Sequence, residues 1–366
     1  MFKNKKNQIV VLIVINILLL ILLDIFLTKV YTIAVGDKKT IVVKHPIYHH
    51  TFKPNSYKNS YFRENYTIFT NSLGFKSNKI ESVDLKNKKK SRRILFIGDS
   101  FTEGVGLNYE DTFVGIIDKK LSENNIEVLN AAQSSYSPII YWRKIKHLLE
   151  VENLNFTDVV VFIDISDAED EAKKYALDKF GNVIDRINNK NQSINNKYFI
   201  DIYSIIQNTT LINYSINKLR NIYINQKYET KEWHDFIRSE YTRDKWTINK
   251  DVYDDYGKIG EDLMIKYMDR LNDMLAKKNI NLTVAVYPWP SQIWHEDLNS
   301  RQALIWENWC NKNNINLLNY FPLFIKKKTS NKMKINVIKE YYFVNDIHLN
   351  KNGNRLIANY FLLNFK

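Results

Sequence analysis

Five nearly continuous apolar stretches constrain the fold of this chain more than any other feature of its sequence. Runs that are apolar throughout, rather than at every second residue, are typical of strands buried on both faces of a parallel sheet. The stretches are RILFIG (93–98), IEVLNAA (126–132), VVVFIDI (159–165), INLTVAVYP (280–288) and INLLNYFP (315–322). Helical patterns such as TFVGIIDKKLSENN (112–125) separate most of them. This alternation predicts an α/β fold, a three-layer sandwich around a doubly wound, mainly five-stranded parallel sheet.

Another apolar segment lies at the amino terminus. The basic tail MFKNKKNQ (1–8) precedes IVVLIVINILLLILLDIFL (9–27), which as a helix reaches roughly 28 Å, close to the hydrocarbon thickness of a bilayer. The segment has no polar face, and its one acid, Asp24, lies near the far end, where an interfacial position lowers its cost. We therefore expect a transmembrane helix over 9–28.

Such a segment is either an uncleaved signal anchor or a cleaved signal peptide. TIAVG (32–36) is a poor small-residue cleavage site, which favours the anchor. Lys29, Lys38, Lys39 and Lys44 follow the span, but a leading basic tail is typical of an export signal. We expect a single-pass protein of a bacterial cell membrane, with its main domain in the periplasm or at the cell surface.

Two further segments complete the predicted organisation. Residues 29–90 are rich in turn-forming and aromatic residues, so we expect an extended linker there, followed by the main domain over 91–366. The stretch 172–270 interrupts the strand–helix rhythm with a polar, helical pattern. It predicts a helical insertion or lid at one edge of the sheet.

Composition narrows the possible partners. The formal charge is +13, but the basic residues are spread along the chain without a nucleic-acid-binding motif, so we expect no nucleic-acid partner. The basic run over 86–93 is either a solvated lead-in to a strand or a contact for anionic lipid or glycan. The single cysteine, Cys310, excludes an intrachain disulfide and is expected in a core. For His45, His49 and His50, a surface or packing role is favoured over a metal site, because no carboxylate stands at ligand spacing.

A candidate nucleophile follows the first apolar run. In GDS (98–100), Ser100 lies where the strand should end, and the following helix points its positive amino-terminal end at the same place. A serine is a poor nucleophile unless a base lies within hydrogen-bond reach. GDS is also a common turn tripeptide, so the motif by itself leaves open whether Ser100 is a turn residue or a nucleophile.

A candidate base stands near the other end of the chain. In VNDIHLNKNGNRLIANYF (344–361), His348 follows the carboxylate of Asp346 by two residues, just before an amphipathic final helix. Such a pair can supply an imidazole base together with the group that fixes its tautomer. Alternatively, the pair is a helix entry with a surface histidine. Taken together, the two ends of the chain favour a serine, histidine and aspartate catalytic triad.

These two blocks resemble those of a known family, the SGNH (GDSL-type) hydrolases. IGDSFTEGVG (97–106) resembles the family block that carries the nucleophile, and DIHLNKNGNRLIA (346–358) resembles the block that carries the acid and the histidine. The resemblance, closest to bacterial membrane-anchored members, implies that Ser100 attacks, His348 is the base and Asp346 orients it, without metal or organic cofactor. Many members place the acid where Asn345 stands, and the Asp346 position is that of members linked to exopolysaccharide acetylation.

The resemblance also implies an oxyanion hole. The family uses the nucleophile's own N–H, the N–H of a glycine after the second strand and an asparagine after the third. In this chain Ser135 takes the place of the glycine and Ser166 that of the asparagine. A backbone N–H survives the first change, but a serine hydroxyl is shorter than an asparagine amide. We therefore expect Ser100 and Ser135 to donate, and Ser166 to do so only through a water or a shifted loop.

Two side chains are predicted to contact substrate. In YPWPSQIW (287–294), Trp289 follows the fourth strand, where it either stacks on a sugar ring or packs in the core. Asp167 belongs to an acidic cluster after the third strand, for which contacts with substrate hydroxyls or a loop-forming role are favoured over a cation site.

The leading hypothesis is therefore a membrane-anchored serine esterase that removes O-acyl groups, such as acetyl, from a cell-surface carbohydrate. The same acyl-serine also suits an O-acetyltransferase that passes the group to a polysaccharide. The changes at Ser135 and Ser166 keep a third reading open, a non-catalytic carbohydrate-binding protein on a degenerate SGNH fold.

Overall fold

The computed structural model describes residues 5–35, 40–62, 65–87, 90–186, 229–325 and 330–365. They belong to two compact units, Met1–Thr40 with Ile187–Tyr228, and Ile41–Arg186 with Glu229–Lys366. The described part of the first unit is mainly the helix α1 (Lys5–Val35). Within it, Gln8–Thr28 has a mean hydropathy of 3.2 and is long and apolar enough to cross a membrane. The apolar helix expected at this end of the chain is therefore present.

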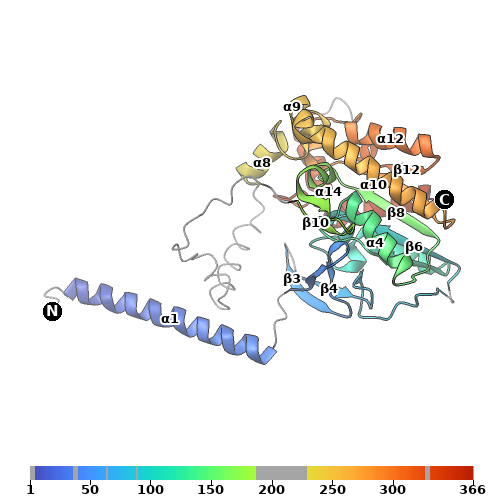
Figure 1. Cartoon of the computed structure of the whole chain (residues 1–366). Coiled ribbons are helices and arrows are strands. Elements are labelled where there is room, and N and C mark those ends of the chain that lie inside the picture. The colour runs from blue at the N-terminus through green and yellow to red at the C-terminus, as the bar shows by residue number, and fades with distance from the viewer. Residues whose placement is uncertain are drawn as a thin grey trace. The chain divides into compact units, whose positions relative to one another are not determined.

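The second unit is built on a mixed sheet of eight strands (Figure 1). Five neighbouring strands run parallel in the spatial order β12, β11, β8, β6, β7. Their bounds are β6 (Arg92–Ile97), β7 (Ile126–Asn130), β8 (Asp158–Ile163), β11 (Asn281–Val286) and β12 (Asn316–Asn319). These are the five apolar stretches, so the predicted parallel core is confirmed. Every residue of β8 is buried, which explains why its sequence does not alternate.

Three antiparallel strands extend the sheet beyond β7. They are β5 (Lys76–Ser77), β4 (Asn65–Thr70) and β3 (Tyr57–Tyr61), and a separate hairpin of β1 (Val42–His45) and β2 (His49–Phe52) precedes them. These strands come from the segment expected to be an extended linker. Strands at a half-exposed edge can be short and polar, and β3 (YKNSY) shows no apolar run that would have indicated it.

Helices cover both faces of the sheet. On one side α4 (Pro138–Glu150) packs against α10 (Lys258–Ala276), as Figure 1 shows. In a separate pair, α3 (Phe113–Ser122) packs against α15 (Lys351–Asn364). Across the sheet, β7 lies on one side of β6, whereas β8, β11 and β12 follow one another on the other side. Because the crossover connections are right-handed, this reversal places helices on opposite faces of the sheet. The three-layer arrangement is as predicted.

The remaining elements are short or lie at the edges. The helix α12 (Arg301–Asn313) carries Cys310, which is buried as expected. The others are α2 (Ser100–Glu103), η1 (Tyr109–Asp111), α5 (Asp167–Glu169), η2 (Asp170–Lys174), β9 (Tyr175–Leu177), β10 (Val183–Asp185), α8 (Lys231–Arg238), η3 (Lys245–Thr247), α9 (Lys250–Val252), η4 (Tyr253–Gly257), α11 (Pro290–Trp294), α13 (Phe321–Phe324) and α14 (Asn331–Tyr341).

The stretch 172–270 is only partly an insertion. Its described parts are the hairpin β9–β10 and the elements from α8 to α10, while residues 187–228 lie outside the described residues. The last of these elements, α10, is a layer helix between β8 and β11 and belongs to the basic α/β rhythm. The insertion therefore ends before α10 begins and occupies the earlier part of the stretch.

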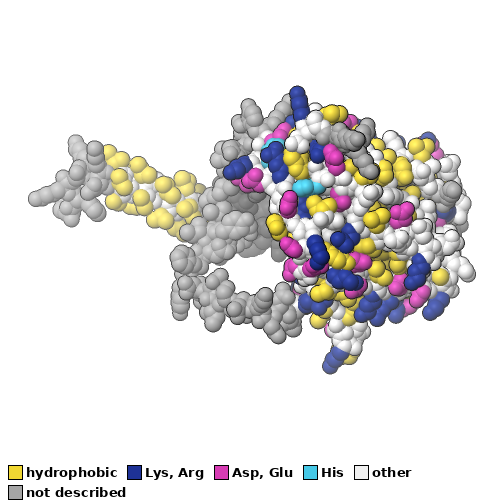
Figure 2. Space-filling model, turned by 90° about the horizontal axis from the view of Figure 1, so that it is seen from above, with side chains coloured by type: hydrophobic (Ala, Val, Ile, Leu, Met, Phe, Trp, Pro, Cys, Tyr) yellow, Lys and Arg dark blue, Asp and Glu magenta, His cyan; other side chains and the backbone are white. Residues whose placement is uncertain are grey.

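Surface charge is mixed, as the composition suggested. Figure 2 shows one face, on which Lys and Arg side chains lie among Asp and Glu side chains rather than in a single basic field. Several basic residues are in ion pairs one turn apart on a helix, such as Lys250 with Asp254 and Lys258 with Asp262. This face therefore offers no extended positive surface.

The strand order identifies one place where a ligand site is expected. β6 pairs with β7 on one side and with β8 on the other, and the direction of chain progression reverses at this point. In open α/β sheets, ligands bind outside the carboxyl ends of the strands at such a switch point. The segments that follow β6, β7 and β8 contain four of the candidate residues, Ser100, Ser135, Ser166 and Asp167.

Candidate active site

Ser100 stands at the carboxyl end of the central strand β6. β6 ends at Ile97, and Ser100 is the first residue of α2, whose N-cap Asp99 accepts the Phe101 N–H at 2.9 Å. At this first helical position the N–H of Ser100 has no carbonyl acceptor within the helix. The side chain is half-buried. Ser100 thus presents, in the same place, a hydroxyl and an N–H that has no acceptor within its helix.

The structure brings Ser100, His348 and Asp346 together. His348 Nε2 lies 2.9 Å from Ser100 Oγ, and His348 Nδ1 lies 2.6 Å from Asp346 Oδ1. The same carboxylate oxygen accepts the backbone N–H of His348 at 2.8 Å. Burial alone would lower the pKa of His348, but the hydrogen bond and charge of Asp346, helped by Asp99 and Asp164, raise it above its ordinary value. The three residues form a continuous chain of contacts from hydroxyl to imidazole to carboxylate.

The loop that carries Asp346 is held by the insertion. Trp233 on α8 donates its indole N–H to the Asp346 carbonyl at 3.1 Å, and the N–H of Thr230 donates to Asn345 Oδ1 at 2.7 Å. Asn345 has a φ of 60°, in the left-handed region that asparagine tolerates better than most residues. Sequence reasoning missed these supports because they join residues more than a hundred positions apart.

Asp99 is a second neighbour of the Ser100 hydroxyl. Its Oδ2 lies 3.0 Å from Ser100 Oγ, so the single hydroxyl proton can point either to Asp99 or to His348. Burial, together with the charge of Asp164, raises the pKa of Asp99 to about 8. In its protonated form Asp99 can donate to Ser100 Oγ, which leaves the serine proton directed at His348.

Asp164, at the end of β8, organises the floor of the site. Its Oδ2 accepts the Tyr287 hydroxyl at 2.7 Å and the Trp289 indole N–H at 2.8 Å. Its Oδ1 accepts the N–H of Ser166 at 2.8 Å and the Ser166 hydroxyl at 2.6 Å. Four donors thus satisfy a carboxylate that is fully buried.

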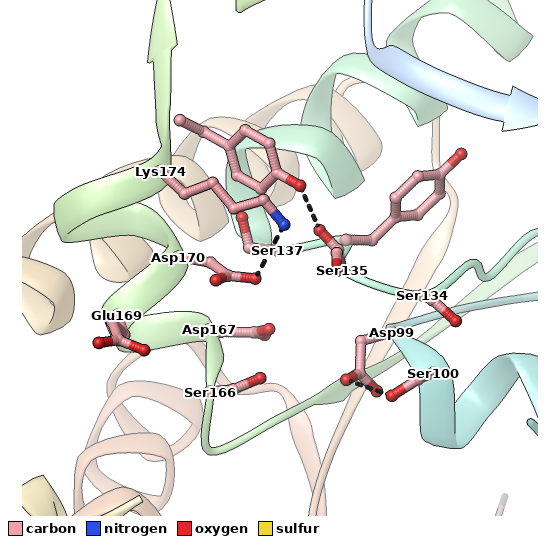
Figure 3. A network of polar contacts seen from close by, with 12 residues as sticks. Asp99, Ser100, Ser134, Ser135, Ser137, Ser166, Asp167, Glu169, Asp170 and Lys174 are labelled. Carbon is pink, nitrogen blue, oxygen red and sulfur yellow. Dashed lines mark hydrogen bonds and ion pairs between the residues drawn. The ribbon is translucent and has the colours of Figure 1, made fainter. Parts of the chain in front are cut away.

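Two of the candidate oxyanion residues, Ser135 and Ser166, differ in their exposure and in their hydrogen bonds. Ser135 is exposed and has a φ of 64°, the left-handed conformation in which a glycine would be unstrained. Ser166 gives its hydroxyl proton to Asp164, and no contact of the described residues joins it to Ser100. Figure 3 shows Ser166 and Asp167 on the loop after β8, across from Asp99 and Ser100. The Ser166 hydroxyl would have to break its bond with Asp164 before it could donate to an oxyanion.

Trp289 and Asp167, both expected to contact substrate, are buried side chains in the structure. Trp289 is 2% exposed, and with its indole bonded to Asp164 it is a core residue, the alternative that its sequence context left open. Asp167 is fully buried and accepts the Tyr141 hydroxyl at 3.0 Å. Burial raises the pKa of Asp167 well above its ordinary value, with further increases from Asp164 and Asp99. Both side chains support the floor of the site rather than its surface.

Within the described ranges, no group of three or more His, Cys, Asp or Glu side chains is arranged to hold a metal ion. The acidic residues after β8 are instead occupied by protein donors. One of them, Glu171, accepts the Ser137 hydroxyl at 2.8 Å and the N–H of Ile139 at 2.7 Å. For these acids, the loop-forming role is the one that the contacts support.

Comparison with known proteins gives structural likenesses only. No protein-family model and no curated protein matches the chain. Similar solved structures include the psychrotrophic esterase EstA from Pseudoalteromonas sp. (14% identity, 75% of this chain and 96% of that one, TM-score 0.38) and a member of the lipolytic protein G-D-S-L family from Veillonella parvula (14%, 75% and 97%, 0.37). A third is the acetyl xylan esterase AlAXEase (14%, 75% and 100%, 0.41).

Proposed function

We propose that this chain is a serine esterase of the SGNH type that removes O-acyl groups, such as acetyl, from a cell-surface carbohydrate. The observation that carries the proposal is the chain of contacts from Ser100 Oγ to His348 Nε2 and from His348 Nδ1 to Asp346, at 2.9 and 2.6 Å. A serine with a base in reach, and a base oriented by a carboxylate, is the arrangement that nucleophilic acyl transfer needs. The apolar stretch Gln8–Thr28 would anchor the enzyme in the cell membrane.

The proposed reaction has two steps. In the first, Ser100 Oγ attacks the acyl carbonyl while His348 Nε2 takes its proton, and the N–H groups of Ser100 and Ser135 stabilise the oxyanion. The tetrahedral intermediate then expels the sugar alkoxide, which receives the proton from His348 and leaves an acyl-serine. In the second, a water loses a proton to His348 and attacks the ester. Collapse then breaks the bond between the acyl carbon and Ser100 Oγ, which takes the proton back from His348 as the free acid is released.

A second function, O-acetyl transfer to a polysaccharide, would use the same acyl-serine. The specific observation in its favour is that the acid bonded to His348 is Asp346, two residues before the histidine, as in the SGNH members linked to exopolysaccharide acetylation. The two functions differ only in whether water or a sugar hydroxyl attacks the acyl-serine.

The proposal is tested by measuring how much of the acyl group passes to water and how much passes to a sugar hydroxyl. The full-length chain in detergent is given p-nitrophenyl acetate, with and without an oligosaccharide acceptor, and free acetate and acetylated sugar are quantified by mass spectrometry. We expect free acetate to account for most of the acyl groups turned over in both conditions. If acetylated oligosaccharide exceeds free acetate, the protein is a transferase instead.

The pH dependence of kcat/KM is expected to be bell-shaped. His348 must be neutral to accept the Ser100 proton, and because its pKa is raised, the acid limb should lie above pH 6.5. Asp99, with a pKa of about 8, becomes a carboxylate on the alkaline side and then competes with His348 for that proton. We therefore expect kcat/KM to fall again above about pH 8.

The variant Asp99→Asn tests whether ionisation of Asp99 causes the alkaline fall of kcat/KM. Its amide keeps a donor for Ser100 Oγ and an oxygen for the Phe101 N–H, but it does not ionise. Initial rates of p-nitrophenyl acetate hydrolysis, corrected for spontaneous hydrolysis, should then stay level at alkaline pH in this variant. An alkaline limb that persists unchanged would assign it to a group other than Asp99.

A further inference from the structure

The loop between β7 and α4 is held in an unusual conformation around Ser135. A serine at a φ of 64° adopts a backbone conformation that L-residues rarely take, and such a conformation persists only where the surroundings enforce it. Ser135 is exposed, so its own side chain is not packed in a way that could enforce it. The restraint must come from groups that bind the backbone of the loop.

Three side chains from separate elements supply that restraint. Glu103 on α2 accepts the N–H and the hydroxyl of Ser134, both at 2.7 Å. His50 on β2 lies with its Nε2 2.9 Å from the Ser134 carbonyl, and Tyr175 on β9 donates its hydroxyl to the Ser135 carbonyl at 2.7 Å. Among the hydrogen bonds of the described residues, these occupy every backbone polar group of Ser134 and Ser135 except the Ser135 N–H.

His50 is itself oriented by its neighbours. Burial lowers the pKa of His50 to about 4, so the ring is neutral and carries one proton. With that proton on Nε2 for the Ser134 carbonyl, Nδ1 accepts from Nδ1 of His49, 2.7 Å away, and His49 Nε2 contacts Asp185 at 3.1 Å. The loop also binds back to the hairpin, since Tyr136 donates its hydroxyl to the His50 carbonyl at 2.6 Å.

We propose that His50 of the hairpin β1–β2 and Tyr175 of β9 are positioning residues of the active site. Together they hold the Ser134–Ser135 backbone so that the Ser135 N–H stays free to bind the oxyanion. This inference rests on the esterase function proposed above. It gives a role in the active site to His50, for which the sequence favoured a surface or packing role. Neither His50 nor Tyr175 touches the substrate in this account, since each acts through the loop.

The test compares donor-removing and donor-keeping variants in the full-length chain. His50→Leu removes the N–H that the Ser134 carbonyl accepts, and Tyr175→Phe removes only a hydroxyl. We expect each to lower kcat for p-nitrophenyl acetate roughly ten-fold, a part of the 10²–10³-fold that removal of a whole oxyanion donor costs. KM should change less than about two-fold, because the loop donor acts on the transition state more than on the bound ester. His50→Gln, whose amide can reach the same carbonyl, should recover most of the loss.

Two matched controls separate this role from general destabilisation. His45→Leu disturbs the same hairpin, where His45 Nδ1 accepts the N–H of Ile47, without touching the Ser134–Ser135 backbone. Tyr320→Phe removes a buried hydroxyl that has no hydrogen-bond partner among the described residues. Both controls should keep kcat near that of the parent chain, whatever their effect on the melting temperature.

The outcomes distinguish this inference from the proposed function. If the parent chain hydrolyses the ester but His50→Leu loses no more kcat than His45→Leu, or His50→Gln recovers nothing, the positioning role is wrong and the esterase stands. If the parent chain has no Ser100-dependent hydrolysis, both proposals fall, since a positioning role requires a reaction.

Discussion

Replacing Ser100 by alanine is expected to lower kcat for p-nitrophenyl acetate by about 10⁴-fold or more, because loss of the nucleophile of a serine triad removes the covalent step. The fold should not change, since the hydroxyl is half-buried and its partners, His348 and Asp99, both keep other hydrogen bonds. The measurement is the initial rate of p-nitrophenolate release, with the melting temperature followed in the same preparation.

Ser122→Ala is the matched control for this change. Ser122 is exposed, and among the described residues its hydroxyl bonds only to the Lys119 carbonyl within α3. This variant should retain the parent rate. A Ser100→Ala protein that keeps more than about a tenth of the parent rate would show that the hydrolysis does not pass through Ser100, because residual rates without the nucleophile lie far lower.

Replacing Asp346 by asparagine is expected to lower kcat by roughly 10²- to 10⁴-fold, since an amide neither fixes the imidazole tautomer as a carboxylate does nor stabilises the imidazolium. The same change should also lower the pKa of His348. The hydrogen bond and charge of Asp346 are the largest of the effects that raise the pKa of His348, so their loss should move the acid limb of the pH profile to lower pH. Both effects are measured in one series of kcat/KM values against pH.

Asp262→Asn serves as the control for Asp346→Asn. Asp262 pairs with Lys258 on the exposed face of α10, where an ion pair contributes little to stability. It should change neither the rate nor the acid limb. An Asp346→Asn variant whose acid limb stays in place would contradict the assignment of Asp346 as the partner of His348.

Much of this fold could be predicted because the central strands are buried on both faces. β6, β8 and β11 therefore show as continuous apolar runs, and their alternation with helices indicates the sheet. The edge strands β3 to β5 have no such signature, since their pairing with β7 depends on neighbours that local pattern cannot identify.

The candidate triad could be predicted because its residues stand in two short blocks of recognisable spacing. The environment of each side chain could not be predicted from these blocks. Trp289 follows a central strand, and its local sequence would be the same whether the side chain faced a cleft or the core. Its burial and its hydrogen bond to Asp164 show that it lies in the core. The bond that occupies Ser166, and the contact of His50 with the Ser134 carbonyl, likewise depend on how distant segments fold together.

The central claim is that Ser100 is activated by His348 to form a covalent acyl intermediate. The most direct measurement is reaction of the full-length chain with a fluorophosphonate, followed by mass spectrometry of its peptides. We predict one adduct, on Ser100, formed in the parent chain and in Ser122→Ala, and lost in both Ser100→Ala and His348→Ala. A folded parent chain that forms no adduct, or forms one on a different residue, would contradict this account.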